Sequence, residues 1–85
     1  MDKYITPNII KVKALDDYLL EITFETKEIK IFNMKKLIDN IDFYKKLKDK
    51  EYFKNVKPCN ETVIWENGED VCPEDLYHNS IEIKK

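Results

Sequence analysis

The sequence predicts one small α+β domain, in which a small antiparallel β-sheet (a β-meander plus a hairpin) carries one inserted helical segment and a short helix near the C-terminus. Three observations predict this fold. Apolar residues alternate with polar ones over residues 9–32, the apolar spacing becomes helical at Met34, and the stretch Trp65–Tyr77 combines a turn signal with a helix start. The 85 residues suit a single domain, 1–85, with a small core.

The first part of the chain predicts three strands. Residues 9–14, 20–25 and 29–32 alternate apolar and polar side chains, which is the period of a strand with one buried face. Tight turns are expected at Asp16-Asp17 and at Glu25-Thr26-Lys27, which separate these runs. Because such short connections join neighbouring strands, we expect an antiparallel meander with one face exposed to water.

A helical segment is predicted from residue 34. Apolar residues recur there at the spacing of helical turns, at Met34, Leu37, Ile38 and Ile41. Asp42 is expected to cap a following helix, whose inward side is formed by Phe43, Tyr44 and Leu47. Asp49 is expected to start one further turn, which carries Tyr52 and Phe53.

The clearest local turn signal is Asn67-Gly68. It favours a type I′ hairpin turn, because both central residues of that turn need a positive φ. Residues 62–65 are the expected strand before the turn and residues 69–71 the short strand after it. Pro73 suits the first position of a helix, and Leu76 is its expected inward anchor. Acidic residues favour the first turn of a helix, here Glu74 and Asp75.

Two flanking segments complete the predicted sheet. A fourth strand is expected to begin at Val56, interrupted by Pro58 and by a polar turn near Asn60-Glu61. After Tyr77, Ile81 and Ile83 alternate with charged neighbours, which is consistent with either a last edge strand or a frayed tail.

Charge is unevenly distributed along the chain. The net charge is −2 overall, and it divides into +3 over residues 1–57 and −5 over residues 58–85. No apolar run approaches the roughly 20 residues of a membrane span, and the N-terminus lacks the basic start and apolar stretch of a signal peptide. We therefore expect a cytoplasmic protein without a membrane partner, in which Cys59 and Cys72 are thiols.

Several stretches together resemble one bacterial family. They are a strand that ends in Leu20-x-x-x-Phe24, an acidic and hydrophobic third strand, the series Leu47, Phe53 and Val56, and the block Ile64-Trp65-x-Asn67-Gly68-x-Asp70-Val71-x-Pro73-x-x-Leu76-Tyr77. In order and spacing, from Ile10 to Tyr77, they resemble the family known as domain of unknown function 2442. The block that contains Trp65 and Asn67-Gly68 is the most specific part.

The resemblance implies a small α+β fold in a bacterial cytoplasm. It also implies that the chain is encoded beside another small uncharacterised protein, an arrangement that looks like a toxin–antitoxin pair. The resemblance assigns no catalytic residue to this chain. The chain departs from the family pattern at Lys27, where a glycine is usual, and at Asn33, where an aspartate is usual. The first departure predicts a different turn geometry. The second removes a carboxylate, so any role that this carboxylate has in the family is not expected to carry over to this chain.

The acidic C-terminal region supplies the candidate partner surface. Its residues are Trp65, Glu66, Glu69, Asp70, Glu74 and Tyr77. One interpretation is a surface that docks a basic partner. The other, which the residue types favour, is a solvated hairpin edge and a helix N-terminus stabilised by its acids. Trp65 is expected mainly as a core anchor, and Asp70 mainly as a helix cap or backbone ligand.

Other kinds of site are less well supported. Cys59, Cys72 and His78 have ligand atoms, but their spacing matches no compact zinc pattern. We expect no metal or cofactor site, and a surface position for His78. Residues 34–57 carry a net charge of +4 and include Tyr44, Tyr52 and Phe53, which would suit nucleic acid. The aromatic spacing is that of a core, so a solvated lysine-rich helical face is the better interpretation.

Three functions of different classes follow. The leading one is a non-enzymatic protein–protein interaction module, in the form of an antitoxin-like partner of a neighbouring small protein. The alternative is a nucleic-acid-binding or regulatory protein that uses the lysine-rich face. The third is an enzyme that uses Cys72 or Asp70, although no catalytic constellation is evident. Since so small a core gains stability from association, a homo-oligomer is also considered.

Overall fold

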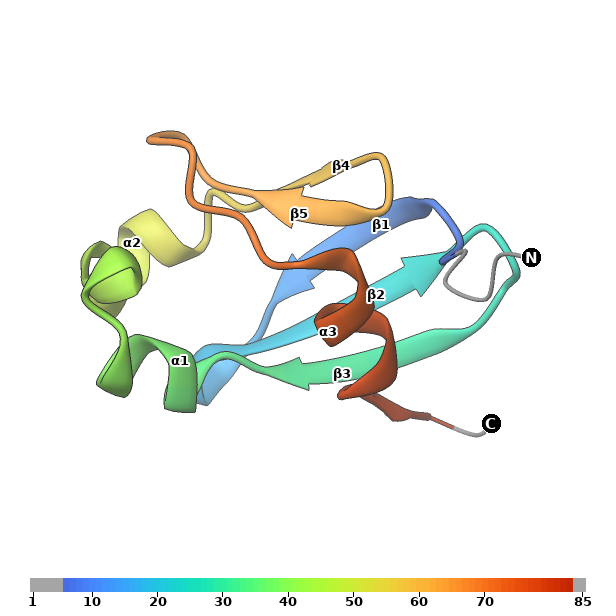
Figure 1. Ribbon diagram of the computed structural model, residues 1–85, viewed down its shortest axis with the longest axis horizontal. Helices are drawn as coiled ribbons and strands as arrows, with labels where there is room; N and C mark the ends of the chain where they lie inside the picture. The colour runs from blue at the N-terminus through green and yellow to red at the C-terminus, as the bar shows by residue number, and fades with distance from the viewer. Residues whose placement is uncertain (1–5, 84–85) are drawn as a thin grey trace.

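The computed structural model describes residues 6–83, and its elements are strands and short helices (Figure 1). Here η denotes a 3₁₀-helix. In chain order the elements are β1 (Ile9–Ala14), η1 (Asp16–Tyr18), β2 (Leu19–Phe24), β3 (Ile29–Asn33), α1 (Lys35–Asn40), η2 (Asp42–Lys48), α2 (Lys50–Phe53), β4 (Lys57–Cys59), β5 (Thr62–Ile64), α3 (Pro73–His78) and β6 (Ile81–Glu82).

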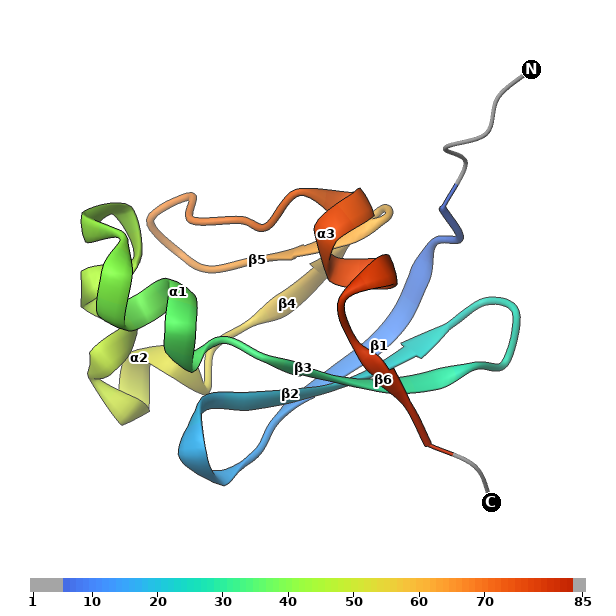
Figure 2. The ribbon, with the colours of Figure 1, turned by 60° about the horizontal axis from the view of Figure 1, so that its bottom comes forward.

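The strands form two antiparallel sheets. One has the order β1-β2-β3-β6, and the other is the hairpin β4-β5. The predicted meander and the α+β class are therefore confirmed. In Figure 2 the β4-β5 hairpin and α3 lie on one side of the larger sheet, and no element of residues 6–83 covers the other side. The core lies between these layers. Its fully buried side chains include Leu20, Ile22, Phe24, Met34, Leu47, Val63 and Leu76.

The inserted helical segment is divided into three short helices. The side-chain oxygen of Asp49 accepts a hydrogen bond from the Glu51 N–H at 3.0 Å, which confirms that Asp49 begins the last of them. The middle one is a 3₁₀-helix whose N-cap is Ile41, without a side-chain cap, so the predicted cap by Asp42 is wrong. Leu47 is buried as expected, but Phe43 is exposed. A 3₁₀-helix has about three residues per turn, so the α-helical assignment of inward positions failed there.

The predicted type I′ turn at Asn67-Gly68 is also wrong. In this pair only Gly68 has a positive φ, of 98°. The Gly68 N–H donates to the Trp65 carbonyl, and the Trp65 N–H donates to the Glu69 carbonyl, each at 2.9 Å. The return segment pairs only through the bridge between Ile64 and Asp70. The two-residue hairpin loop lies instead at Asn60-Glu61, between Cys59 and Thr62, where a polar turn was expected.

The turn between β2 and β3 keeps a left-handed residue without glycine. Lys27 has a φ of 83°. Its N–H donates to the Phe24 carbonyl, and the Phe24 N–H donates to the Glu28 carbonyl, each at 2.9 Å. This is the bonding pattern of the Gly68 turn. Lys27 therefore occupies the left-handed conformation that glycine adopts more easily, and a turn geometry different from the family's stays a prediction.

The C-terminal helix and strand follow the sequence signals. Pro73 occupies the first turn of α3, Glu74 and Asp75 lie in the same turn, and Leu76 is fully buried. Ile81 and Glu82 pair with Ile31 and Lys30 of β3, which confirms the edge strand. The end of the predicted tail, residues 84–85, lies outside the described residues.

Candidate interaction surface

Trp65 belongs to the core. Its side chain is 2 % exposed. The indole N–H donates to the Phe53 carbonyl at 2.9 Å, and the two rings stack with centroids 5.8 Å apart. These contacts attach the loop after β5 to α2. The core assignment of Trp65 is confirmed, and its side chain is removed from the predicted partner surface.

Glu69 is buried as well, which the sequence did not indicate. Only 6 % of this residue is exposed. The Tyr52 hydroxyl donates to Oε1 of Glu69 at 2.6 Å, and the Tyr52 oxygen accepts the Asn67 N–H at 2.7 Å. Removal from water and the hydrogen bond to Glu69 raise the pKa of Tyr52. Glu69 therefore holds its own loop in place, and its inclusion in an exposed surface is corrected.

The other acidic residues of the region lie at or near the surface. Glu66, Asp70 and Asp75 are exposed, and Glu74 is half-buried. The N-cap of α3 is Cys72, and no side chain caps this helix. The expectation that Asp70 caps α3 is therefore wrong. The Asp70 carboxylate instead contributes negative charge to the surface beside η2.

Tyr77 attaches α3 to the larger sheet. Its hydroxyl donates to Oε1 of Glu28 at 2.7 Å, and its carbonyl accepts a hydrogen bond from Lys30 Nζ at 2.9 Å. The same Nζ lies 3.7 Å from the centroid of the Tyr77 ring. The hydrogen bond to Glu28, together with burial, raises the pKa of Tyr77 to about 12. The contacts of Tyr77 are thus mainly within the fold.

An exposed aromatic residue adjoins the acidic residues. The Tyr44 hydroxyl donates to the Asp70 carbonyl at 2.8 Å. Burial, followed by the negative charges of Asp70 and Asp75, raises the pKa of Tyr44, which places both carboxylates near this phenol. The ring of Phe43 lies edge-on to Tyr44 at 5.0 Å, and Phe43 is 56 % exposed. Phe43, Tyr44, Asp70 and Asp75 are together called the Phe43 surface below.

A groove borders the Phe43 surface between α1 and α3. Its volume is about 420 Å³. It is lined by Phe32, Asn33, Lys36, Leu37, Asp75 and Asn79. Asp75 belongs both to this lining and to the carboxylates near Tyr44. Sequence reasoning missed this site because it placed Phe43 in the core, and because α1 and α3 are far apart along the chain.

The remaining candidate residues do not gather into a reactive centre. Cys59 is half-buried, Cys72 is exposed, and both are free thiols. His78 is exposed, as expected. Over residues 6–83, no group of three or more His, Cys, Asp or Glu side chains is arranged to hold a metal ion.

The lysine-rich segment is solvated, and two of its aromatic residues, Tyr52 and Phe53, are not available for stacking. Its lysines are all exposed, namely Lys35, Lys36, Lys45, Lys46, Lys48, Lys50, Lys54 and Lys57. Tyr52 and Phe53 are buried. Bases stack on exposed aromatic rings, so these two residues cannot serve a nucleic-acid interface. In the part of the chain that the structure describes, no helix is long and apolar enough to cross a membrane.

Comparison with known proteins identifies the family. Neither the curated proteins nor the solved structures gave a match. Residues 9–82 match the family described as protein of unknown function (DUF2442), which agrees with the block around Trp65 and Asn67-Gly68. This match covers most of the 85 residues, and the chain therefore belongs to the DUF2442 family.

Proposed function

We propose that this protein is a non-enzymatic protein–protein interaction module of the bacterial cytoplasm, and that it binds a small protein encoded beside it in the manner of an antitoxin. One observation carries the proposal. On the Phe43 surface, the Phe43 side chain is 56 % exposed, its ring lies edge-on to that of Tyr44, and carboxylates lie nearby.

The composition of this surface suits protein recognition. Binding energy at interfaces is concentrated in a few anchors, often aromatic, that enter a pocket of the partner. Phe43 is held at its base by the Tyr44 ring, whose hydroxyl is fixed to the Asp70 carbonyl. Little side-chain freedom is then lost on binding. Asp70 and Asp75 favour a basic partner, because complementary charges steer encounter and fix orientation.

The non-enzymatic part of the proposal is supported by what the perturbed ionisable groups do. Among residues 6–83, the groups with shifted pKa values are Glu28, Tyr44, Tyr52 and Tyr77. Each of them makes a hydrogen bond to another part of the chain. Shifted pKa values are a mark of catalytic sites when they gather in a cleft. Here they accompany contacts that join separate elements of the fold.

Co-purification tests the proposal. The tagged chain is co-expressed with the protein encoded by the neighbouring gene, and the recovered ratio of the two is measured. We expect equal amounts with the unaltered chain, and at least a tenfold loss of the partner with Phe43→Ala. The double variant Asp70→Asn/Asp75→Asn is expected to lose a smaller share, and that loss should shrink at high salt.

Ile10→Ala is the matched control. Ile10 is also exposed, at 59 %, and it lies at the start of β1, at the other end of the molecule from η2 (Figure 1). Equal recovery of the partner by the unaltered chain, the Phe43 variant and the Ile10 variant would exclude the Phe43 surface as the docking site. Recovery of the unaltered chain without its neighbour would exclude the partner.

A further inference from the structure

We infer that the Phe43 surface also joins two copies of this chain, with Phe43 of each copy in the groove between α1 and α3 of the other. This inference rests on the proposed function, because both assign docking to the same surface. It goes further by naming an occupant, a second copy, that the purified protein can test alone.

The surface carries both a projecting side chain and a site that can receive one. Phe43 projects from η2, and Ile41 at the start of the same helix is 42 % exposed. The groove has an apolar wall formed by Phe32 and Leu37. Its volume is about 420 Å³, and α3 borders it through Asp75 and Asn79. A Phe ring buries roughly 150–250 Å² of surface when it is enclosed, so this insertion would dominate the contact.

The projection and the groove are neighbours on one face. Asp75 of α3 lines the groove, and Tyr44, whose ring contacts Phe43, is hydrogen-bonded to Asp70 in the loop just before α3. A two-fold axis between the projection and the groove places each Phe43 in the opposite groove with a single rotation. Such an isologous contact closes on itself as a dimer, whereas a groove on a distant face would produce an open chain.

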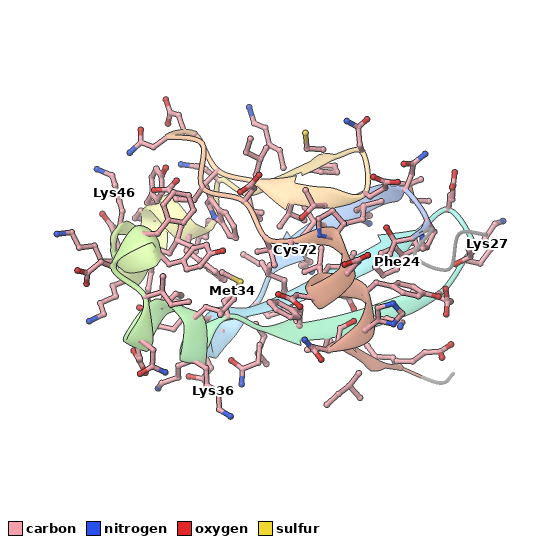
Figure 3. All side chains as sticks on the ribbon, viewed as in Figure 1. Phe24, Lys27, Met34, Lys36, Lys46 and Cys72 are labelled. Atoms are coloured by element: carbon pink, nitrogen blue, oxygen red, sulfur yellow. The ribbon has the colours of Figure 1, made fainter. Side chains whose placement is uncertain are left out.

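The charges around Phe43 are also self-complementary. Both signs of charge occur on each side of the contact: Asp42, Lys45 and Lys46 flank Phe43 and are exposed, and the groove is lined by both Asp75 and Lys36. Figure 3 shows Lys36 and Lys46 pointing outward at the end of the molecule formed by α1 and η2, while Met34 points inward. In the two-fold arrangement Lys45 of one copy approaches Asp75 of the other, twice. Exposed ion pairs are weak, so they set orientation, and the two Phe43 side chains supply most of the affinity.

Sedimentation of the purified, untagged chain over micromolar concentrations is the first test. We expect a reversible dimer. The dimer dissociation constant of Phe43→Ala should be at least tenfold higher, and that of Ile10→Ala unchanged. Since Phe43 is exposed, its replacement leaves the core intact, and a circular dichroism melt checks this. A chain that is monomeric throughout, or a dimer that Phe43→Ala leaves unchanged, overturns the inference.

A charge exchange in trans makes the test specific. Lys45→Glu alone opposes two carboxylates at each contact, and Asp75→Lys alone opposes two ammonium groups. Each variant should therefore be more monomeric than the unaltered chain. Mixed together, they restore opposite charges at both contacts, so we expect a heterodimer at or above the affinity of the unaltered chain. If a lysine in the first turn of α3 lowers its stability, Asp75→Asn replaces it. The mixture then keeps one of the two ion pairs, so its heterodimer should be tighter than the dimer of either variant alone and weaker than that of the unaltered chain.

Failure to form the heterodimer after mixing overturns the arrangement proposed here, even if the unaltered chain dimerises. Binding of the neighbouring protein is measured separately, by co-purification. A monomeric chain that still binds that protein through Phe43 would remove the dimer and leave the proposed function in place. If the chain neither dimerises nor binds that protein through Phe43, the Phe43 surface is not a docking site at all.

Discussion

At the residue scale, the turns at Lys27 and Gly68 show how the same backbone shape is reached at different cost. Gly68 has a φ of 98° and Lys27 a φ of 83°, with matching hydrogen bonds across each turn. A residue with a Cβ is strained in this region, and glycine is not. The turn of β2 and β3 therefore keeps its shape because its neighbouring bonds outweigh the strain at Lys27.

Lys27→Gly should stabilise the protein. The substitution relieves the left-handed strain, but glycine also has greater freedom in the unfolded chain. The net result should be a free energy of unfolding that is about 0.5–1 kcal/mol higher. Urea unfolding measures it. Gly68→Ala is the reciprocal variant. A Cβ there meets no atom within 4 Å, so its expected loss of about 1 kcal/mol is purely conformational. A Lys27→Gly protein that is less stable than the parent would contradict this account.

The hydrogen bond between Tyr77 and Glu28 predicts a pH dependence. The bonds from Tyr77 and then Thr26 lower the pKa of Glu28, so its contribution is present above about pH 4.5 and is lost as pH falls through the lowered value. The pKa of Tyr77 is raised to about 12, so its contribution is present below about pH 10 and is lost as pH rises through about 12.

Tyr77→Phe isolates this bond. At neutral pH we expect a loss of about 1 kcal/mol, because Glu28 is partly solvated and can bond to water instead. Urea unfolding at pH 7 and at pH 3 should show the difference between variant and parent shrinking in acid, as the carboxylate is protonated. A difference that is the same at both values would mean that packing of the ring, and not the bond, is responsible.

At the element scale, the strands follow from period-two patterning, but the loop after β5 does not follow from its sequence. Asn67-Gly68 is a strong local hairpin signal. It was overruled by contacts to α2: the buried Trp65 bonds to Phe53, and Glu69 bonds to Tyr52. Both partners are more than ten residues away, so no local pattern reveals them. The prediction that Phe43 faces the core was wrong for a related reason. The apolar spacing did not reveal that residues 42–48 form a 3₁₀-helix.

Tyr52→Phe should weaken the attachment of this loop strongly. The change leaves the buried Glu69 carboxylate and the Asn67 N–H without the hydroxyl that joins them. Unpaired buried polar groups cost about 1–3 kcal/mol each, so we expect a loss of about 2 kcal/mol or more in urea unfolding. Tyr44→Phe is the control, since it removes a tyrosine hydroxyl at the surface and should cost less. Equal losses would refute the structural role of Glu69.

Asn33 has a structural task at the start of α1. Its Oδ1 accepts the Lys35 N–H at 2.9 Å at the start of α1. An aspartate can make the same bond, so the carboxylate is not required for it. Asn33→Ala should lose about 1 kcal/mol in a thermal or urea melt, and Asn33→Asp should lose nothing. A loss for Asn33→Asp as large as that for alanine would exclude this capping role.

At the scale of the whole molecule, one core joins two sheets, and among residues 6–83 large apolar side chains are exposed in at least two areas. The fold class and the three-stranded meander were predictable, because they depend on periodicity and short turns, whereas the pairing of β6 with β3 and the separate β4-β5 sheet were not. The Phe43 surface was not, since it arises where η2, α3 and the loop before α3 meet. A second area lies at the β3-β6 edge of the larger sheet, where Ile81 is 74 % exposed and pairs with Ile31. Figure 2 shows this edge and the uncovered face of the sheet.

Nuclear magnetic resonance distinguishes these two areas directly. The amide signals of the labelled chain are followed during titration with the neighbouring protein and, separately, with increasing concentration of the chain itself. The account predicts that the largest changes lie at Phe43, Tyr44 and Asp75 and along the groove between α1 and α3. Changes concentrated at Ile31 and Ile81 would place docking at the β3-β6 edge of the larger sheet and contradict it.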